Sequence, residues 1–235
     1  MSAAEKRPPF SVSASVLPRN LLRKRPRIPG LGFGFASIHE GPPPAVHEAE
    51  LGLASRMAPA RALEFRTGRW ALRRALRDAG LAPGPVLRDG RRPLPPPGVA
   101  VSLSHSHGIA VAVAGPAAAF PALGIDLELG SLPTAAAHLV LHPAEPLLPA
   151  APRSAADRRL TTLFSVKEAA YKAFSALLDD SARRRGVLPG LRALQVRRTA
   201  GGYTARADAV PGAEVQVTVR HLPEGVLSWA VPVRI

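Results

Sequence analysis

The segment F-S-V-K-E-A-A-Y-K-A at residues 164–173 decides the fold of the C-terminal half. Apolar residues recur around it at steps of three and four, which is the spacing of one helix face; they are Leu163, Val166, Ala170, Ala173 and Leu177. The pattern predicts a helix from about residue 155 to about residue 178. Glu168 and Lys172 are four residues apart and share a neighbouring face of that helix. Taken alone, such a pair is typical of an exposed salt bridge, so its role depends on the rest of the chain.

The composition is that of a globular protein with a full core, because 46% of the 235 residues are hydrophobic. The chain has no cysteine, which excludes disulfides, Cys nucleophiles and Cys-ligated zinc. Its formal net charge of +14 favours negatively charged partners: nucleic acid, anionic membrane, phosphorylated metabolites or an acidic protein. We find neither a membrane-spanning run nor a signal peptide, so we expect a cytoplasmic protein without a membrane partner, and residues 1–10 are expected to be disordered.

A second pattern, L-G-I-D-L-E-L at residues 123–129, alternates strictly and predicts a strand. Its apolar residues would face the core, and Asp126 and Glu128 would share the opposite face. Two neighbouring carboxylates cost little in water, but when partly buried they need a cation. Mg²⁺ suits them, since it takes one or two carboxylates and completes its shell with water and phosphate oxygens.

The other elements indicate helices combined with antiparallel strands. A helix begins near Pro59 and ends before Gly80, with Arg61 and Arg69 on its apolar stripe and Arg73 on the side away from the core. Strands are expected at 99–103 and 109–114, joined by a polar turn at 104–108. Residues 130–154 are expected to be loop, except for a short helical start that the sequence allows at 142–145. The remaining strands form a meander, at residues 191–198, 203–208, 214–221 and 227–234.

Four blocks of sequence, in order, resemble the 4′-phosphopantetheinyl transferases. G-I-D-L-E at 124–128 followed by residues 164–173 is similar to the paired signature of that family. R-A-L-E-F-R-T-G-R at 61–69 and R-R-P-L-P-P-P-G-V-A-V-S-L-S-H at 91–105 resemble two further family blocks. The chain is most similar to the siderophore-synthetase-associated and actinobacterial branch, although Pro95 replaces a tryptophan and Val101 a glycine of the family pattern.

The resemblance implies the architecture of the larger class in that family. This is an α+β fold of two pseudo-repeated halves, each a helix packed on an antiparallel sheet, with the active site at their interface. We therefore expect an N-terminal half at residues 1–121 and a C-terminal half at 122–235 that carries the metal and catalytic motifs. Because one chain then carries a complete site, we expect a monomer.

The resemblance also implies the reaction and its participants. The phosphopantetheine arm of coenzyme A would pass to a serine of an apo acyl-carrier or peptidyl-carrier protein of secondary metabolism, with Mg²⁺ or Mn²⁺, releasing adenosine 3′,5′-bisphosphate. The implied metal ligands are Asp126, Glu128 and Glu168, and the implied catalytic residues are Asp126, Glu168 and Lys172. The implied coenzyme A contacts are Arg61, Arg69, Gly90, Arg91, Arg92, Pro93, Ser104, His105 and Lys172. Glu168 has two open roles, base for the serine hydroxyl or metal ligand, and it can combine them.

Three other functions stay open from the residues themselves. A basic nucleic-acid-binding protein would fit the charge, although an aromatic content of 5% argues against base stacking, and we expect no nucleic acid as partner. A Mg²⁺-dependent nucleotide phosphohydrolase would use the same carboxylates, and a degenerate family member would bind coenzyme A without turning it over.

Overall fold

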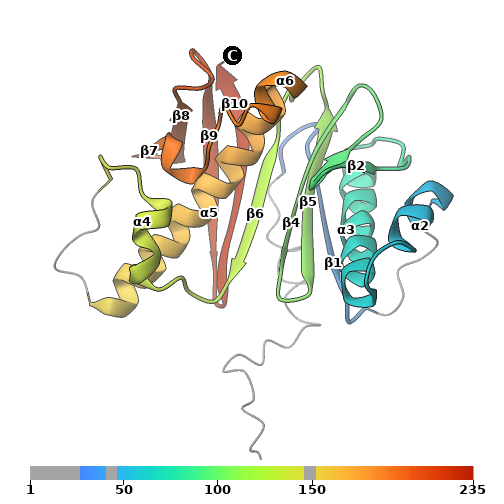
Figure 1. Ribbon diagram of the computed structural model, residues 1–235, viewed down its shortest axis with the longest axis horizontal. Coiled ribbons are helices and arrows are strands. Elements are labelled where there is room, and N and C mark those ends of the chain that lie inside the picture. Colours follow the sequence, from blue (N-terminus) through green and yellow to red (C-terminus); the bar gives the residue numbers. More distant parts are fainter. Residues whose placement is uncertain (1–26, 41–46, 146–151, 235) are drawn as a thin grey trace, which may run out of the picture.

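The structure is a computed structural model that describes residues 27–40, 47–145 and 152–234 (Figure 1). The expected disorder of residues 1–10 lies outside these residues. Within them, none of the helices is long and apolar enough to cross a membrane.

The N-terminal half is a three-stranded antiparallel sheet packed against one long helix. Its strands, in spatial order, are β1 (Gly32–Ser37), β5 (Ile109–Pro116) and β4 (Val99–Ser106). The long helix α3 (Pro59–Asp78) packs on β1 and β5, and α2 (Glu48–Ala54) contacts α3. A hairpin of β2 (Leu87–Asp89) and β3 (Arg92–Leu94) leads from α3 to β4. Pro59 lies in the first turn of α3, and Gly80 follows its last turn with φ +73°, as the sequence predicted.

The C-terminal half repeats this arrangement with a larger sheet. Its strands, in spatial order, are β6 (Gly124–Leu129), β10 (Gly225–Arg234), β9 (Glu214–Leu222), β8 (Gly202–Ala207) and β7 (Leu194–Thr199). The helix α5 (Arg153–Leu177) packs on β6, β10 and β9. The short elements are a 3-10 helix (Thr134–Ala136), α4 (Ala137–Val140), α6 (Asp180–Arg184) and a second 3-10 helix (Leu191–Ala193). The structure thus confirms the α+β fold of two halves, the long helix and the meander.

Alternation along β6 separates its apolar side chains from its carboxylates. Ile125 and Leu127 belong to a central core that also takes in Phe33 of β1 and Trp229 of β10. The rings of Phe33 and Trp229 meet edge to face, with centroids 5.6 Å apart. Asp126 lies between the two apolar residues and therefore points to the other face, toward α5, as the alternation predicted.

Each half has a glycine where its strand meets its helix. A Cβ on Gly34 of β1 would lie 1.9 Å from the carbonyl oxygen of Ala71 in α3. A Cβ on Gly124 of β6 would lie 1.8 Å from the carbonyl oxygen of Ala169 in α5. The backbones of strand and helix are in direct contact at both points, so the two halves share the same close helix-on-strand packing.

Several expectations about local structure are wrong. Residues 104–108 are not all turn, since β4 continues to Ser106 and only His107 and Gly108 form the turn, with φ 49° and 75°. Residues 130–154 are not all loop, since they include helical turns from Thr134 to Val140. Arg73 does not lie away from the core: it is buried, and its guanidinium pairs with buried Glu50 at 2.5 Å.

The boundary between residues 121 and 122 stays a prediction. The last strand of the first sheet ends at Pro116, and the first strand of the second sheet begins at Gly124. The change from one sheet to the other therefore occurs within the connection that contains this boundary.

Candidate active site between the two halves

The two halves meet where β4 lies beside β6 (Figure 1). Alternate serines of β4 point at β6: the Ser102 hydroxyl accepts a hydrogen bond from the Ile125 N–H at 3.1 Å, and the Ser106 hydroxyl accepts one from the Leu129 N–H at 3.2 Å. Between them, Ser104 donates its hydroxyl to Asp126 Oδ1 at 2.9 Å. The three serine contacts therefore fix Asp126 in register with the opposite half.

Lys172 completes the surroundings of Asp126. Its ammonium donates to Asp126 Oδ1 at 2.8 Å, to the Ile125 carbonyl at 2.9 Å and to the Ser104 hydroxyl at 3.2 Å. Asp126 is only 2% exposed, and its second oxygen, Oδ2, is buried without a hydrogen-bond partner among the described residues. A buried carboxylate oxygen without a donor is costly, so this oxygen is available to a cation or a ligand.

The carboxylates around Asp126 outnumber the nearby cations. The pKa of Glu128 is raised to about 7, first by burial and then by the charge on Asp126, while Lys172 opposes both. Burial, and then the charge on Asp126, also raise the pKa of Glu168, again against Lys172. The Lys172 ammonium lies 4.0 Å from Glu168 Oε2 and also forms an ion pair with Asp126. One ammonium for three carboxylates leaves negative charge that a divalent cation would neutralise.

The residues fit a divalent cation bound with help from a substrate. In the part of the chain that the structure describes, no three His, Asp or Glu side chains already stand in position to hold a metal ion. Mg²⁺ needs only one or two protein carboxylates when phosphate oxygens and water complete its octahedron. The unpartnered Asp126 Oδ2 and the partly buried Glu128 supply that number.

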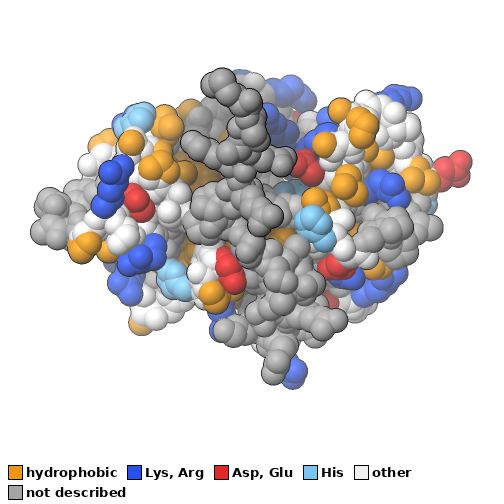
Figure 2. Space-filling view, turned by 90° about the horizontal axis from the view of Figure 1, so that it is seen from below, with side chains coloured by type: hydrophobic (Ala, Val, Ile, Leu, Met, Phe, Trp, Pro, Cys, Tyr) orange, Lys and Arg blue, Asp and Glu red, His pale blue; other side chains and the backbone are white. Residues whose placement is uncertain are grey.

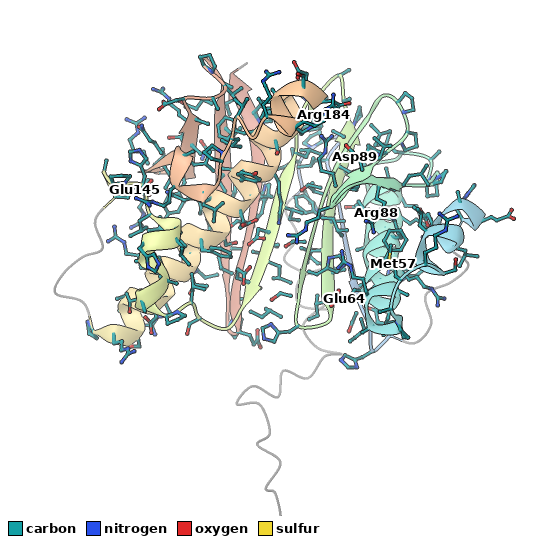
Figure 3. The ribbon with its side chains drawn as sticks, in the orientation of Figure 1. Met57, Glu64, Arg88, Asp89, Glu145 and Arg184 are labelled. Carbon is teal, nitrogen blue, oxygen red and sulfur yellow. The ribbon has the colours of Figure 1, made fainter. Side chains whose placement is uncertain are left out.

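A cavity of about 820 Å³ opens between the halves beside this cluster. Its N-terminal wall includes Arg91, Arg92, Pro93, Pro95 and Val101, and its C-terminal wall includes Glu168, Tyr171, Lys172, Arg183 and Arg184. Figure 3 shows Asp89 of the hairpin and Arg184 of α6 near one another at this side of the molecule. Arginines on both walls, together with Lys172 on the C-terminal wall, make the cavity suitable for a ligand with several negative charges.

Two arginines of the cavity differ in how they are held. Burial lowers the pKa of Arg92, the nearby charge of Arg183 lowers it further, and Arg92 Nη1 is buried without a partner among the described residues. Arg183 is engaged: its guanidinium donates to the carbonyls of Ser175 and Leu178 and pairs with Asp180. Arg92 is therefore the better placed of the two to bind an anion.

Comparison with known families decides the family of the chain. Residues 47–115 match the family model described as the 4′-phosphopantetheinyl transferase N-terminal domain. Residues 122–228 match the model described as the 4′-phosphopantetheinyl transferase superfamily. The chain belongs to this superfamily. It is thus a transferase of this class, and the second match contains β6 and α5, which carry the carboxylate cluster. No curated protein matches the chain significantly.

The transferase brings only some of its sequence-predicted site residues to the cavity. Arg91, Arg92, Pro93, Glu168 and Lys172 line it. Asp126 and Ser104 contact Lys172 behind the cavity wall, and Gly90 lies at the turn of the β2–β3 hairpin with φ 57°.

Arg61, Arg69 and His105 lie on the α3 side, outside the residues that line the cavity. Arg61 is exposed and pairs with Glu64 at 2.9 Å. Arg69 is buried, which lowers its pKa to about 10; its Nη2 donates to the Leu87 carbonyl at 2.7 Å and its Nε is unpartnered among the described residues. The roles of these arginines as coenzyme A contacts stay predictions.

His105 is fixed between α3 and the carboxylate cluster. Its Nε2 lies 3.1 Å from the Glu64 carbonyl, and a Cβ on Gly68 would lie 2.7 Å from that nitrogen. Burial lowers the pKa of His105, and the charges of Arg61 and Lys172 add to this. The role of His105 as a phosphate contact stays a prediction.

The sequence interpretation missed α6 and its arginines. The signal was available, because the run D-D-S-A-R-R-R at residues 179–185 begins with a good N-cap residue. In the structure, the Asp179 carboxylate accepts a hydrogen bond from the Ala182 N–H at 2.7 Å. This cap directs Arg183 and Arg184 to the cavity wall.

Proposed function

We propose that the protein transfers the 4′-phosphopantetheine arm of coenzyme A to a serine of an apo acyl-carrier or peptidyl-carrier protein. The reaction is Mg²⁺-dependent and releases adenosine 3′,5′-bisphosphate. The observation that supports this most strongly is the buried Asp126 Oδ2, which has no hydrogen-bond partner among the described residues and lies beside Lys172, a residue that lines a cationic cavity of about 820 Å³. That volume is within the range of sites that bury a cofactor-sized ligand.

Asp126 and Glu128 would hold the metal, with Glu168 as the third candidate ligand. Bound Mg²⁺, or Mn²⁺ with the same oxygen ligands, would offset the charge of the coenzyme A pyrophosphate. The anionic groups of the nucleotide end would contact Arg61, Arg69, Arg91, Arg92, Ser104 and His105, and Gly90 and Pro93 would border it. Arg184 of α6 would add a positive charge on the opposite wall.

Glu168 and Lys172 would move and balance the charges of the reaction. Glu168 accepts the proton of the carrier serine hydroxyl, and its raised pKa brings it closer to the working pH of a base. The serine oxygen then forms a bond to the phosphorus that bears the pantetheine arm. The bond from that phosphorus to the bridging oxygen breaks, and its electron pair stays on adenosine 3′,5′-bisphosphate. The positive charge of Lys172 offsets the negative charge that develops on the phosphate oxygens. Metal binding and proton transfer compete for the lone pairs of Glu168.

The partner and the setting follow from charge and from the resemblance of the four blocks. A net charge of +14 attracts an acidic carrier protein. Resemblance to the siderophore-synthetase-associated and actinobacterial branch supports a carrier of secondary metabolism, met in the cytoplasm by a monomeric enzyme. On the face drawn in Figure 2, Lys and Arg side chains are scattered over both halves among acidic and apolar ones. The described residues that this view shows do not form a continuous basic track for nucleic acid.

A mass-shift assay tests the proposal. The protein, Mg²⁺, coenzyme A and a panel of apo carriers are incubated, and the carriers are examined by intact-mass spectrometry. We expect at least one carrier to gain the mass of phosphopantetheine, and Asp126→Asn to abolish the gain. Coenzyme A cleavage without any carrier would support a phosphohydrolase instead. Salt-sensitive polyanion binding that Asp126→Asn leaves intact, together with unchanged carriers, would support the nucleic-acid alternative.

A further inference from the structure

Lys167 is a fully buried lysine, immediately before Glu168 on α5, and the reaction above does not use it. Its ammonium donates to the Val140 carbonyl at 3.0 Å and to the Leu194 carbonyl at 2.9 Å, and it pairs with Glu145 Oε2 at 2.5 Å; the Leu191 carbonyl lies farther away, at 3.4 Å. An ammonium has three N–H donors, so these acceptors satisfy it completely. Charged side chains are rarely buried to this degree unless they are paired in this way.

The partner of Lys167 is itself held by the backbone. Glu145 Oε1 accepts a hydrogen bond from the Val196 N–H at 2.7 Å, and Oε2 accepts one from the His142 N–H at 3.0 Å. We call Lys167, Glu145 and the carbonyls of Val140 and Leu194 the Lys167 cluster. The cluster joins α5 to α4 and to the start of β7 through directional contacts.

The Lys167 cluster and the active site lie on opposite flanks of α5. Figure 3 shows Glu145 on the side of α5 away from the three-stranded sheet. Glu168 and Lys172 line the cavity that faces that sheet. Successive residues of a helix are about 100° apart around its axis, so the orientation of Lys167 determines the direction in which Glu168 points.

A small rotation of α5 would be enough to disturb the site. Side-chain ends lie about 5–6 Å from a helix axis, so a rotation of about 20° moves them by about 2 Å. A displacement of that size breaks the 2.8 Å contact between Lys172 and Asp126. The apolar stripe of α5 and its close contact with Gly124 hold the helix against the sheet, but hydrophobic contacts are not directional. The hydrogen bonds of Lys167 resist it directly.

We propose that Lys167 is a positioning residue: by binding Glu145 and two backbone carbonyls on one flank of α5, it fixes the rotation of the helix and holds Glu168 and Lys172 opposite Asp126. The inference rests on the proposed function for its consequence in turnover. The geometry of Lys172 can be measured without turnover, so the two proposals fail separately.

The test replaces the charges of the cluster and keeps its shape. In Lys167→Met with Glu145→Gln, the methionine keeps the apolar stem, and the single amide oxygen of the glutamine can still accept from one of the two N–H groups, that of Val196 or that of His142. The matched control is Arg73→Met with Glu50→Gln, which removes a buried ion pair of the same 2.5 Å length from the other half. Glu145→Gln alone is the second variant in case the double variant does not fold, and it keeps the Lys167 ammonium and its carbonyl acceptors.

The first measurement is turnover with saturating coenzyme A and carrier. A displacement of catalytic groups by about 1 Å can reduce a rate by about 100-fold. We therefore expect kcat to fall about 10-fold to 100-fold in Lys167→Met with Glu145→Gln, several-fold in Glu145→Gln alone, and less than about twofold in the control. An equal loss of kcat in the cluster variant and the control would overturn the proposal, since general destabilisation would then explain both.

The second measurement is the acylation rate of Lys172 by an amine-reactive ester, followed by peptide mass spectrometry. Four lysines in the whole chain make the assignment simple. Lys172 is held by three acceptors, and rotation of α5 would release it. We expect its acylation to become several-fold faster in the cluster variants and to stay unchanged in the control. An unchanged rate in the cluster variants overturns the positioning role. Absence of turnover in the parent, with Lys172 released in the variants, counts against the proposed function alone.

Discussion

The raised pKa of Glu128 makes the stability of the metal-free protein depend on pH. Burial, and then the charge on Asp126, move this pKa from an ordinary 4.5 to about 7, so the folded protein binds the proton more tightly than the unfolded chain does. The contribution of Glu128 to the free energy of unfolding is therefore fully present below pH 4.5. It falls as the pH rises toward 7, and above about 7 it is lost.

The size of this change in the free energy of unfolding follows from the difference between the ordinary and the raised pKa of Glu128. Moving from 4.5 to about 7 corresponds to at most about 3 kcal/mol. Glu128 is only partly buried and solvent screens its charge, so we take about 2 kcal/mol. For a chain of this length, that free energy corresponds to a change in Tm of about 4–8 °C.

Thermal unfolding of the parent and of Glu128→Gln, followed by circular dichroism in EDTA, measures the effect. Glutamine resembles the protonated acid, so we expect similar Tm values at pH 5. At pH 8 we expect the variant to be more stable by about 4–8 °C. Mg²⁺ at pH 8 should raise the Tm of the parent more than that of the variant, because the parent retains both carboxylates of the pair.

Glu64→Gln is the matched control, since Glu64 is half exposed on α3 and pairs only with the neighbouring Arg61 among the described residues. A Tm difference between parent and Glu128→Gln that is the same at pH 5 and pH 8 would refute the reasoning. So would a pH-dependent difference of equal size in Glu64→Gln, because the effect would then belong to surface charge in general.

Three further predictions follow from single contacts. Gly124→Ala should destabilise the fold by about 1–3 kcal/mol in thermal unfolding, because its Cβ would lie 1.8 Å from the Ala169 carbonyl oxygen. Gly52→Ala is the control and should be neutral, because a Cβ there would have nothing within 4 Å. Equal effects of the two substitutions would contradict the packing argument. Glu168→Gln should reduce kcat by about 100-fold or more and keep coenzyme A binding by calorimetry, and unchanged turnover would remove Glu168 from the chemistry. Arg184→Ala should raise the KM for coenzyme A several-fold with little change in kcat, and an unchanged KM would exclude Arg184 from the site.

The regular elements could be predicted from the sequence because they depend on local periodicity. The apolar stripe of α5 and the alternation of β6 each involve one segment, so steps of three and four, or of two, are sufficient. The same periodicity placed Asp126 opposite the apolar residues of β6, and the structure has it there. The approach of Asp126 to Lys172 became an expectation only through the resemblance to a family, since no local pattern relates residues 46 positions apart.

The features that escaped prediction depend on partners far along the chain. The polarity of Ser104 predicts a turn residue, but Ser104 lies in a strand, where its hydroxyl binds Asp126 across the interface. Arg73 was placed on the outside of α3 because arginine is usually exposed, and its burial depends on Glu50 of α2. Lys167 is a similar case, since its acceptors come from α4 and β7. Each of these three residues carries a polar group whose partner is determined by tertiary packing, so local sequence patterns do not predict where the side chain lies.

The position of the active site follows from the edges of the two sheets. β4 is the last strand of one sheet and β6 the first strand of the other, so each would present unpaired backbone groups to its neighbour. Ser102 and Ser106 accept the N–H groups of Ile125 and Leu129, which satisfies that edge of β6 through side chains instead of a backbone ladder. Because these contacts are made by side chains, the interface contains serine hydroxyls, and one of them, that of Ser104, donates a hydrogen bond to Asp126. A continuous sheet across this interface would have closed it with backbone hydrogen bonds. The serine-bridged edges therefore explain how a buried carboxylate with one unpartnered oxygen can exist between two packed halves.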